Sequence, residues 1–285
     1  MAFDDRLPFS FTCCRLLNEP DVRLLALKRL ALKRIVLSWV VFLMLSPSAF
    51  PAQDVRVIGY QFPPFVKQAD TGLTQALLKL LNEAQSDYHF SFHLTSPARR
   101  YRDLSSGIGD VIFFEMPEWE WREKNIPIDI SRELLGGGEV YIALQKPQRE
   151  QAYFDDITSK RIAAILNYHY GFAGFNSDRQ WLENNFDIYL TSNHTTNIRI
   201  LLAGRVDVAV VPEAFLQNYL KAKPELKDKI MVSDKRDQAY SLRALIRKGA
   251  PITVDWLERC LDKIKQTGHL KKLARDYGIE RLLTY

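Results

Sequence analysis

The strongest constraint on the fold is an alternation of short apolar runs with amphipathic helical patterns, which begins near Gln53. Val55–Ile58 has the composition of a strand, and a helical face with an apolar residue about every 3.6 positions follows over 73–84. Tyr88–Leu94 alternates as a strand does, and Asp110–Phe114 is typical of a buried strand. This order predicts an α/β fold with a mostly parallel sheet and helices on its faces.

The same pattern restarts after the glycines at 136–138. We expect strands at Val140–Leu144, 161–166, Ile188–Leu190, Val206–Val211 and Ser241–Arg247, and helices at 173–184, 195–203, 213–222, 253–265 and 270–277. Two similar α/β units predict two lobes, and the cleft between them is the natural place for a ligand.

Residues 1–52 have the organisation of a secretory signal peptide with an unusually long N-terminal region. Basic residues precede the apolar run Ile35–Leu45, and small, helix-breaking residues follow it up to Ala52. The run has eleven residues, whereas a membrane-spanning helix needs about 20. We therefore expect export to the periplasm, with an uncleaved N-terminal anchor as the alternative. Cys260 is the one cysteine after this segment, so we expect no internal disulfide.

The formal net charge of +5 is concentrated before Gln53, where seven basic residues stand against four acidic ones. The remaining chain carries a net charge of only +2 and lacks the positive field that binding to a phosphate backbone needs. We therefore expect no nucleic-acid partner. The sequence also offers no Ser/His/Asp set, nucleophilic cysteine or metal-ligand cluster at a suggestive spacing. It predicts a protein that is not an enzyme and that holds no metal or cofactor.

Four segments, in their order and spacing, resemble bacterial extracellular solute-binding proteins of family 3, the receptors of polar amino-acid uptake systems. The segments are Val55–Phe65, which includes an aromatic–Pro–Pro–Phe loop, Ser105–Ile112, Trp121–Ser131 and Leu201–Val210. The resemblance implies a two-lobed periplasmic-binding-protein fold of type 2, with mixed sheets flanked by helices and a ligand cleft between the lobes. It also implies that the lobes close on the ligand about a hinge.

The resemblance further implies two crossing strands between the lobes, which we expect near Glu139–Leu144 and Tyr240–Arg247. The first lobe would consist of residues 53–140 and 245–285, and the second of residues 141–244. A protein of this kind is a monomer that captures a small molecule, an amino acid or a related carboxylate. It would deliver this ligand to an ABC-transporter permease or a membrane sensor.

Two ligand-binding residues follow from the resemblance in the first lobe. Arg122 matches the family arginine that clamps a ligand carboxylate, a task for which a planar guanidinium is suited because it donates two parallel hydrogen bonds. The alternative is a solvated arginine within the charged stretch 118–124. Phe62 matches the aromatic residue that stacks on the apolar part of the ligand. Arg99 and Arg100 are similar to a basic residue near the cleft in some members, or they begin a charged helix.

Three further candidates lie after strands. Tyr168 and Tyr170 belong to a turn that, in the family, binds an anion with its backbone N–H groups and a hydroxyl. Their neighbour His169 has no second metal ligand at a workable spacing, so we expect no metal there. Glu213 either replaces the aspartate that receives the ligand's ammonium in amino-acid receptors, or simply begins the next helix; Pro212 stands at the expected position.

Glu115 follows the apolar strand Asp110–Phe114 and should project toward the cleft. A carboxylate there could bind a cationic ligand group, or it could act as a general acid. The second role defines an alternative function, a periplasmic enzyme on the same fold, such as a dehydratase of a cyclic carboxylate.

Overall fold

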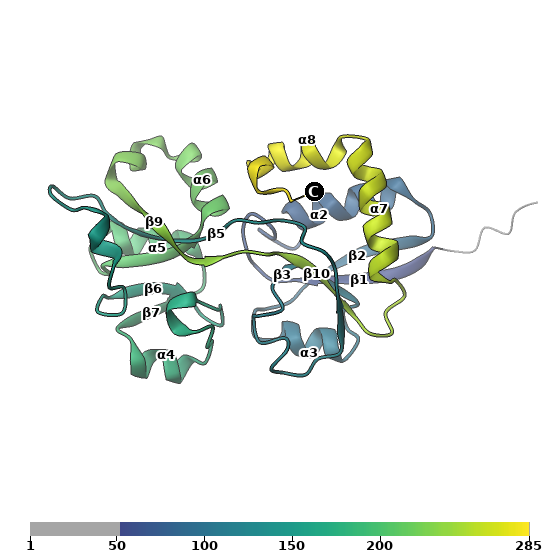
Figure 1. The fold of residues 1–285 in the computed structure, drawn as a ribbon, viewed down its shortest axis with the longest axis horizontal. Helices are drawn as coiled ribbons and strands as arrows, with labels where there is room; N and C mark the ends of the chain where they lie inside the picture. The colour runs from purple at the N-terminus through teal and green to yellow at the C-terminus, as the bar shows by residue number, and fades with distance from the viewer. Residues whose placement is uncertain (1–51, 285) are drawn as a thin grey trace, which may run out of the picture. The chain divides into compact units, whose positions relative to one another are not determined.

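The computed structural model describes residues 52–284, which contain two five-stranded sheets (Figure 1). The strand order is β2-β1-β3-β10-β4 in the first sheet and β7-β6-β8-β5-β9 in the second. We call each sheet, together with its helices, a lobe. Both sheets are mixed, so the predicted fold class, two lobes of α/β structure with mixed sheets flanked by helices, is confirmed.

In the first sheet β1 runs parallel to β2 and β3, whereas β10 runs antiparallel to β3 and β4. The central strand β3 is buried at every position, which explains its uninterrupted apolar sequence before Glu115. The helix α2 buries four leucines of its amphipathic face. The elements are β1 (Gln53–Gly59), α2 (Leu73–Ala84), β2 (Tyr88–Leu94), α3 (Arg100–Ser105), β3 (Val111–Glu115), β4 (Ile128–Ile130), β10 (Arg243–Arg247), α7 (Val254–Gln266), α8 (His269–Asp276) and the 3₁₀ helix η4 (Glu280–Leu282).

In the second sheet β6 runs parallel to β7 and β8, and β5 runs antiparallel to β8 and β9. Asn193 and Asp178 cap the helices α5 and α4, because each side chain accepts a hydrogen bond from a backbone N–H three residues later. The elements are β5 (Gly138–Leu144), η1 (Gln151–Phe154), β6 (Ile162–Ile165), η2 (Gly171–Ala173), α4 (Arg179–Asn185), β7 (Ile188–Thr191), α5 (His194–Leu202), β8 (Val208–Pro212), α6 (Glu213–Ala222), η3 (Pro224–Lys229) and β9 (Ile230–Ala239).

Two segments connect the sheets: residues 131–137 lead from β4 to β5, and residues 240–242 lead from β9 to β10. They pair with each other, since Leu134 N donates to the Leu242 carbonyl at 2.8 Å and Tyr240 N to the Gly137 carbonyl at 2.9 Å. Residues 139–144, where we expected the first crossing, lie in β5 of the second sheet, so this crossing comes earlier in the chain. The predicted lobe boundaries stay a prediction.

Two sequence expectations concern export. The predicted signal peptide, residues 1–52, lies outside the described residues except for Ala52. Between residues 52 and 284, no helix combines the length and the apolar character needed to cross a bilayer.

Candidate functional site

The candidate site lies where parallel strands of both lobes end in aromatic and charged side chains. Tyr60 and Phe62 follow β1, Glu115 ends β3, and Tyr168 follows β6. All four side chains are buried. The Tyr168 ring meets those of Tyr60 and Phe62 edge-on, with centroid distances of 5.7 and 5.8 Å. Two of the expected ligand residues, Phe62 and Tyr168, are thus in contact although they belong to different lobes.

Five aromatic side chains form what we call the ring cluster: Tyr60, Phe62, Trp119, Tyr168 and Tyr240. Phe62 is central, because its ring centroid lies between 5.8 and 6.0 Å from each of the other four. Tyr240 belongs to the crossing segment 240–242, so the cluster includes the connection between the lobes. Rings in such an arrangement can contact the apolar part of a ligand or a cation.

Arg100 is the buried cation of the site. Its Nε lies 3.3 Å from Glu115 Oε2, and only 1% of each of these two side chains is exposed. Arg100 Nη1 donates to the Pro97 carbonyl at 2.5 Å, and Nη2 donates to the Tyr101 hydroxyl at 2.7 Å. The guanidinium also lies over the rings of Tyr60 and Tyr101, 4.9 and 4.3 Å from their centroids. These contacts replace the water that a buried charge loses.

Glu115 points into the site because the end of β3 is irregular. Phe114 adopts the left-handed conformation with φ of 61°, and the pairing with β10 shifts register at this point. The Glu115 carboxylate accepts from Trp121 Nε1 at 2.7 Å, and the Tyr60 hydroxyl faces it. Burial raises the pKa of Glu115, although Arg100 opposes this shift. Its second oxygen, Oε1, has no hydrogen-bond partner among the described residues.

A second buried carboxyl group, Glu139 of β5, adjoins the ring cluster through Tyr240. Gln238 Nε2 donates to Glu139 Oε2 at 2.8 Å and to the His169 carbonyl at 2.6 Å, while Gln238 Oε1 accepts from Trp119 Nε1 at 2.9 Å. Burial, followed by the nearby charge of Asp237, raises the pKa of Glu139 to about 8. Glu139 is therefore largely protonated at neutral pH.

His169 connects the two lobes through both ring nitrogens. Nδ1 lies 3.3 Å from Arg100 Nη2, and Nε2 lies 3.2 Å from the Tyr101 hydroxyl and 3.6 Å from Glu120. Arg100 can only donate, so Nδ1 is the acceptor and Nε2 carries the proton. Burial lowers the pKa of His169 to about 4, although Glu120 favours the charged form. Across residues 52–284, no three His, Cys, Asp or Glu groups are placed to hold a metal ion.

The turn after β6 binds a carboxylate of the chain itself. The backbone N–H groups of Gly171 and Phe172 donate to Asp237 at 2.7 and 2.8 Å, and the Tyr141 hydroxyl donates to the same carboxylate at 2.6 Å. The Tyr170 hydroxyl accepts from Ile165 N at 2.6 Å, so this ring holds the turn against β6. These turn N–H groups, which we expected to receive a ligand anion, already have an anionic partner.

Arg122 and Glu213 lie apart from the ring cluster in the structure. The Arg122 side chain is 65% exposed, and its Nη2 is 3.6 Å from Glu118 of the preceding turn. Glu213 begins α6 and forms two hydrogen bonds with Arg236, at 2.8 and 3.0 Å. The ligand-binding roles expected for these two residues stay predictions.

An open hollow of about 470 Å³ adjoins the ring cluster at Tyr168. Its wall combines residues after β2 in the first lobe with residues after β6 and β7 in the second, so it lies between the lobes. The lining contains hydroxyl and amide groups but no charged side chain: Gln61, Leu94, Thr95, Ser96, Pro97, Ile165, Leu166, Asn167, Tyr168, Leu190, Thr191 and Ser192. A volume of this order accommodates a small metabolite.

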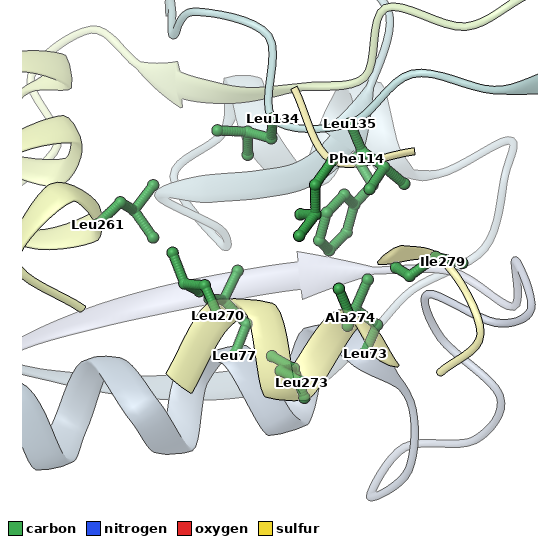
Figure 2. A pocket seen from close by; sticks show the side chains of 11 residues that line it. Leu73, Leu77, Phe114, Leu134, Leu135, Leu261, Leu270, Leu273, Ala274 and Ile279 are labelled. Atoms are coloured by element: carbon green, nitrogen blue, oxygen red, sulfur yellow. The ribbon is translucent and has the colours of Figure 1, made fainter. Parts of the chain in front are cut away.

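A different, apolar hollow of about 40 Å³ lies within the first lobe (Figure 2). Its leucines come from α2, α7, α8 and the crossing segment 131–137, and Phe114 and Ile279 also point into it. It offers neither a charge nor a hydrogen-bonding side chain, and its size is that of a packing defect of the core.

Sequence reasoning missed Glu139, His169 and Gln238 as parts of the site. A signal for Glu139 exists, because it is the only charged residue in the apolar sequence of β5, Gly138–Leu144. A carboxyl group in a buried strand needs a specific partner, and that requirement marks a functional position. Gln238 gives no such signal, since it lies among the charged residues of β9.

No family model matches the chain, and no curated protein matches it in sequence. Solved structures share its fold. The histidine-bound substrate-binding protein of an ABC uptake transporter from Streptococcus pneumoniae has a TM-score of 0.63 and 16% identity, covering 81% of this chain and 95% of that one. The glutamate-bound ligand-binding core of GluR0 from Nostoc punctiforme has a TM-score of 0.61 and 15% identity, covering 78% and 98%.

A third similar structure is an ancestral amino-acid-binding protein that is a precursor of cyclohexadienyl dehydratase. It has a TM-score of 0.57 and 20% identity, covering 79% of this chain and 94% of that one. At these identities the similarity shows the fold, which is the two-lobed fold of amino-acid-binding proteins.

Proposed function

We propose that this chain is a periplasmic solute-binding protein that captures a small polar ligand, an amino acid or a related carboxylate, between its two lobes. One observation carries the proposal: strands from both lobes end in a buried group of aromatic and charged side chains. A buried ion pair and a second buried carboxyl group are costly features, and a ligand site is a reason to keep them.

The connection between the lobes supports a hinge mechanism. Within residues 52–284, only the segments 131–137 and 240–242 lead from one sheet to the other. The remaining contacts at the site are side-chain contacts, such as Trp119 with Gln238 and Arg100 with His169. Side-chain contacts can separate while two paired segments bend, so the lobes open to admit a ligand and close over it.

The proposed binding residues are Phe62, Glu115 and Tyr168, supported by Arg100. Tyr170 orders the turn that carries Tyr168. After export by the N-terminal signal, the monomeric protein would present its ligand to an ABC-transporter permease or to a membrane sensor. The similar structures support this proposal, since one of them is the substrate-binding protein of an ABC transporter.

A ligand screen tests the proposal. Thermal unfolding of the purified protein is measured with amino acids, amines and organic acids, and a specific ligand raises the midpoint in proportion to RT ln(1 + [L]/Kd). Phe62→Ala should lower the affinity for the ligand found in this screen by about tenfold or more, because it removes the central ring of the ring cluster. Trp181→Ala, which removes an exposed ring from the first turn of α4, is the control. If no solute stabilises the protein, the proposal is wrong.

Arg122→Ala separates two versions of the site. In the structure Arg122 is exposed, so we expect this variant to bind the ligand as the unchanged protein does. A loss of affinity would show that Arg122 enters the site when the ligand binds, as its family position predicts.

The second candidate is an enzyme, a dehydratase of a cyclic carboxylate on the same fold. The observation in its favour is the raised pKa of buried Glu115, which suits a general acid, together with the similarity to a precursor of a dehydratase. Conversion of a cyclic carboxylate that Glu115→Gln abolishes, without loss of substrate binding, would establish the enzyme in place of the binding protein.

A further inference from the structure

Most hydrogen-bond donors of the buried site are already engaged with the protein. Each of the three guanidinium nitrogens of Arg100 donates to a neighbour. The indole N–H groups of Trp119 and Trp121 donate to Gln238 and Glu115, and both hydrogens of the Gln238 amide are used. A ligand carboxylate would therefore compete with the protein for most of these donors.

A carboxylate acceptor, in contrast, remains. Glu115 Oε1 is buried and accepts no hydrogen bond from any residue between 52 and 284. A buried polar atom without a partner costs free energy, which a ligand that donates a hydrogen bond would recover. The site thus has a buried carboxylate oxygen to spare, while most of its donors are used.

The charges of the buried side chains also favour a cationic ligand. Arg100 is paired with Glu115, but Glu139 has only the Gln238 amide and the Tyr240 hydroxyl beside it, and no described cation forms an ion pair with it. Asp237 lies nearby and adds further negative charge. One more positive charge would balance Glu139 once this residue gives up its proton.

The aromatic rings of the site also favour a cationic ligand. The ring cluster reaches both carboxyl groups, because Tyr60 faces Glu115 and Tyr240 faces Glu139. Tyr168 is within electrostatic range of both carboxyl groups. An aromatic ring attracts a cation over its face, and this attraction strengthens when water is excluded.

We propose that the site recognises a cationic group, an ammonium or guanidinium, which Glu115, Glu139 and the ring cluster bind, and that a ligand carboxylate is not required. This inference rests on the proposed solute-binding function and names its ligand class. The uncharged lining of the adjoining hollow receives the rest of the ligand, which is polar and neutral there.

A cation at Glu139 has a consequence for protons. The Glu139 pKa of about 8 means that the free protein holds a proton there at neutral pH. A bound cation favours the carboxylate, so binding releases this proton and affinity rises from pH 6.5 to pH 8. Titratable and charged groups surround Glu139 on several elements. They are Tyr141 on β5, Tyr168 and Tyr170 after β6, Asp237 on β9, and Tyr240 just after β9. Arg236 of β9 is hydrogen-bonded to Glu213.

Ligands that differ in one charged group show whether the site recognises the cation or the carboxylate. Thermal shift and calorimetry are measured with arginine, agmatine, citrulline, putrescine, choline and succinate. Agmatine is arginine without its carboxylate, and citrulline lacks the cationic side chain of arginine. We expect agmatine or another carboxylate-free cation to stabilise the protein, and succinate to have no effect. Stabilisation by succinate but by no cation overturns the inference while leaving the solute-binding function intact. If none of the solutes acts, both proposals fail.

Glu139→Gln tests the residue, with Glu83→Gln, the same substitution at an exposed position of α2, as a control. Glu139→Gln should weaken cation binding by about ten- to a hundredfold, the effect of losing a hydrogen bond to a charged group. Calorimetry at pH 7.5 in buffers of different ionisation enthalpy should show proton release with the unchanged protein and Glu83→Gln, but not with Glu139→Gln. Unchanged affinity and proton release in Glu139→Gln would remove Glu139 from the site.

Discussion

At the scale of single residues, the buried ion pair of Arg100 and Glu115 contributes to the stability of the protein and balances the charge of the site. Removing only the guanidinium leaves a carboxylate in an environment that excludes water. Arg100→Met should therefore lower the free energy of unfolding by about 3–5 kcal/mol. The double change Arg100→Met with Glu115→Gln should cost less, because no unpaired charge remains. Urea denaturation measures both; a double variant less stable than Arg100→Met would contradict this account.

Phe62 and Tyr168 were expected from the family resemblance of two loops, and the structure brings their rings to 5.8 Å from each other. Their ligand-binding roles stay predictions. The position of the Arg122 side chain was harder to predict. In the turns after β3, adjacent side chains point in opposite directions, so Trp121 is fully buried and Arg122 is exposed. The sequence of this stretch alternates Glu and Trp and does not reveal which side is inside. The buried cation is Arg100, which comes from a different element and whose burial depends on Glu115.

At the scale of elements, the strand–helix alternation predicted most of the architecture, and its failures have local causes. The helix expected at 173–184 is divided, because Asp178 caps a new helix, α4, after the short η2. The strand β9 was not expected, since Ser233–Asp237 is polar and charged. Its place in the sheet depends on pairing with β5 along its length. Such pairing connects residues about a hundred positions apart and leaves no local pattern.

The turn after β6 gives a prediction at this scale. A Cβ atom on Gly171 would lie 2.1 Å from the Asp237 carbonyl oxygen, a backbone atom that cannot move alone. Gly171→Ala should therefore separate the turn from β9 and lower the free energy of unfolding by about 1–3 kcal/mol. Gly136→Ala is the control, because its Cβ would meet no atom closer than 3.6 Å. Thermal unfolding compares them, and equal midpoints would show that the turn adapts without cost.

At the scale of the whole molecule, the contact between the lobes depends on a neutral histidine. His169 belongs to the second lobe, yet Arg100, Tyr101 and Glu120 of the first lobe surround its ring. A proton on Nδ1 would face the Arg100 guanidinium and would break the hydrogen bond between them. The closed arrangement of the lobes therefore excludes the charged imidazole, whereas an open or unfolded chain accepts it.

This exclusion predicts the direction of a pH effect. The pKa of His169 is about 4 in the structure and about 6.5 in an unfolded chain. Its contribution to stability is therefore fully present above pH 6.5 and is lost as the pH falls toward 4, by an amount on the order of 3 kcal/mol. His169→Gln should flatten the dependence of unfolding free energy on pH between 6.5 and 4, while the exposed His93→Gln should not. Buried His194, whose pKa is about 3, contributes in the same direction and is present in both variants. Denaturant titrations at several pH values measure the slopes, and an unchanged slope in His169→Gln would show that its protonation does not oppose the contact between the lobes.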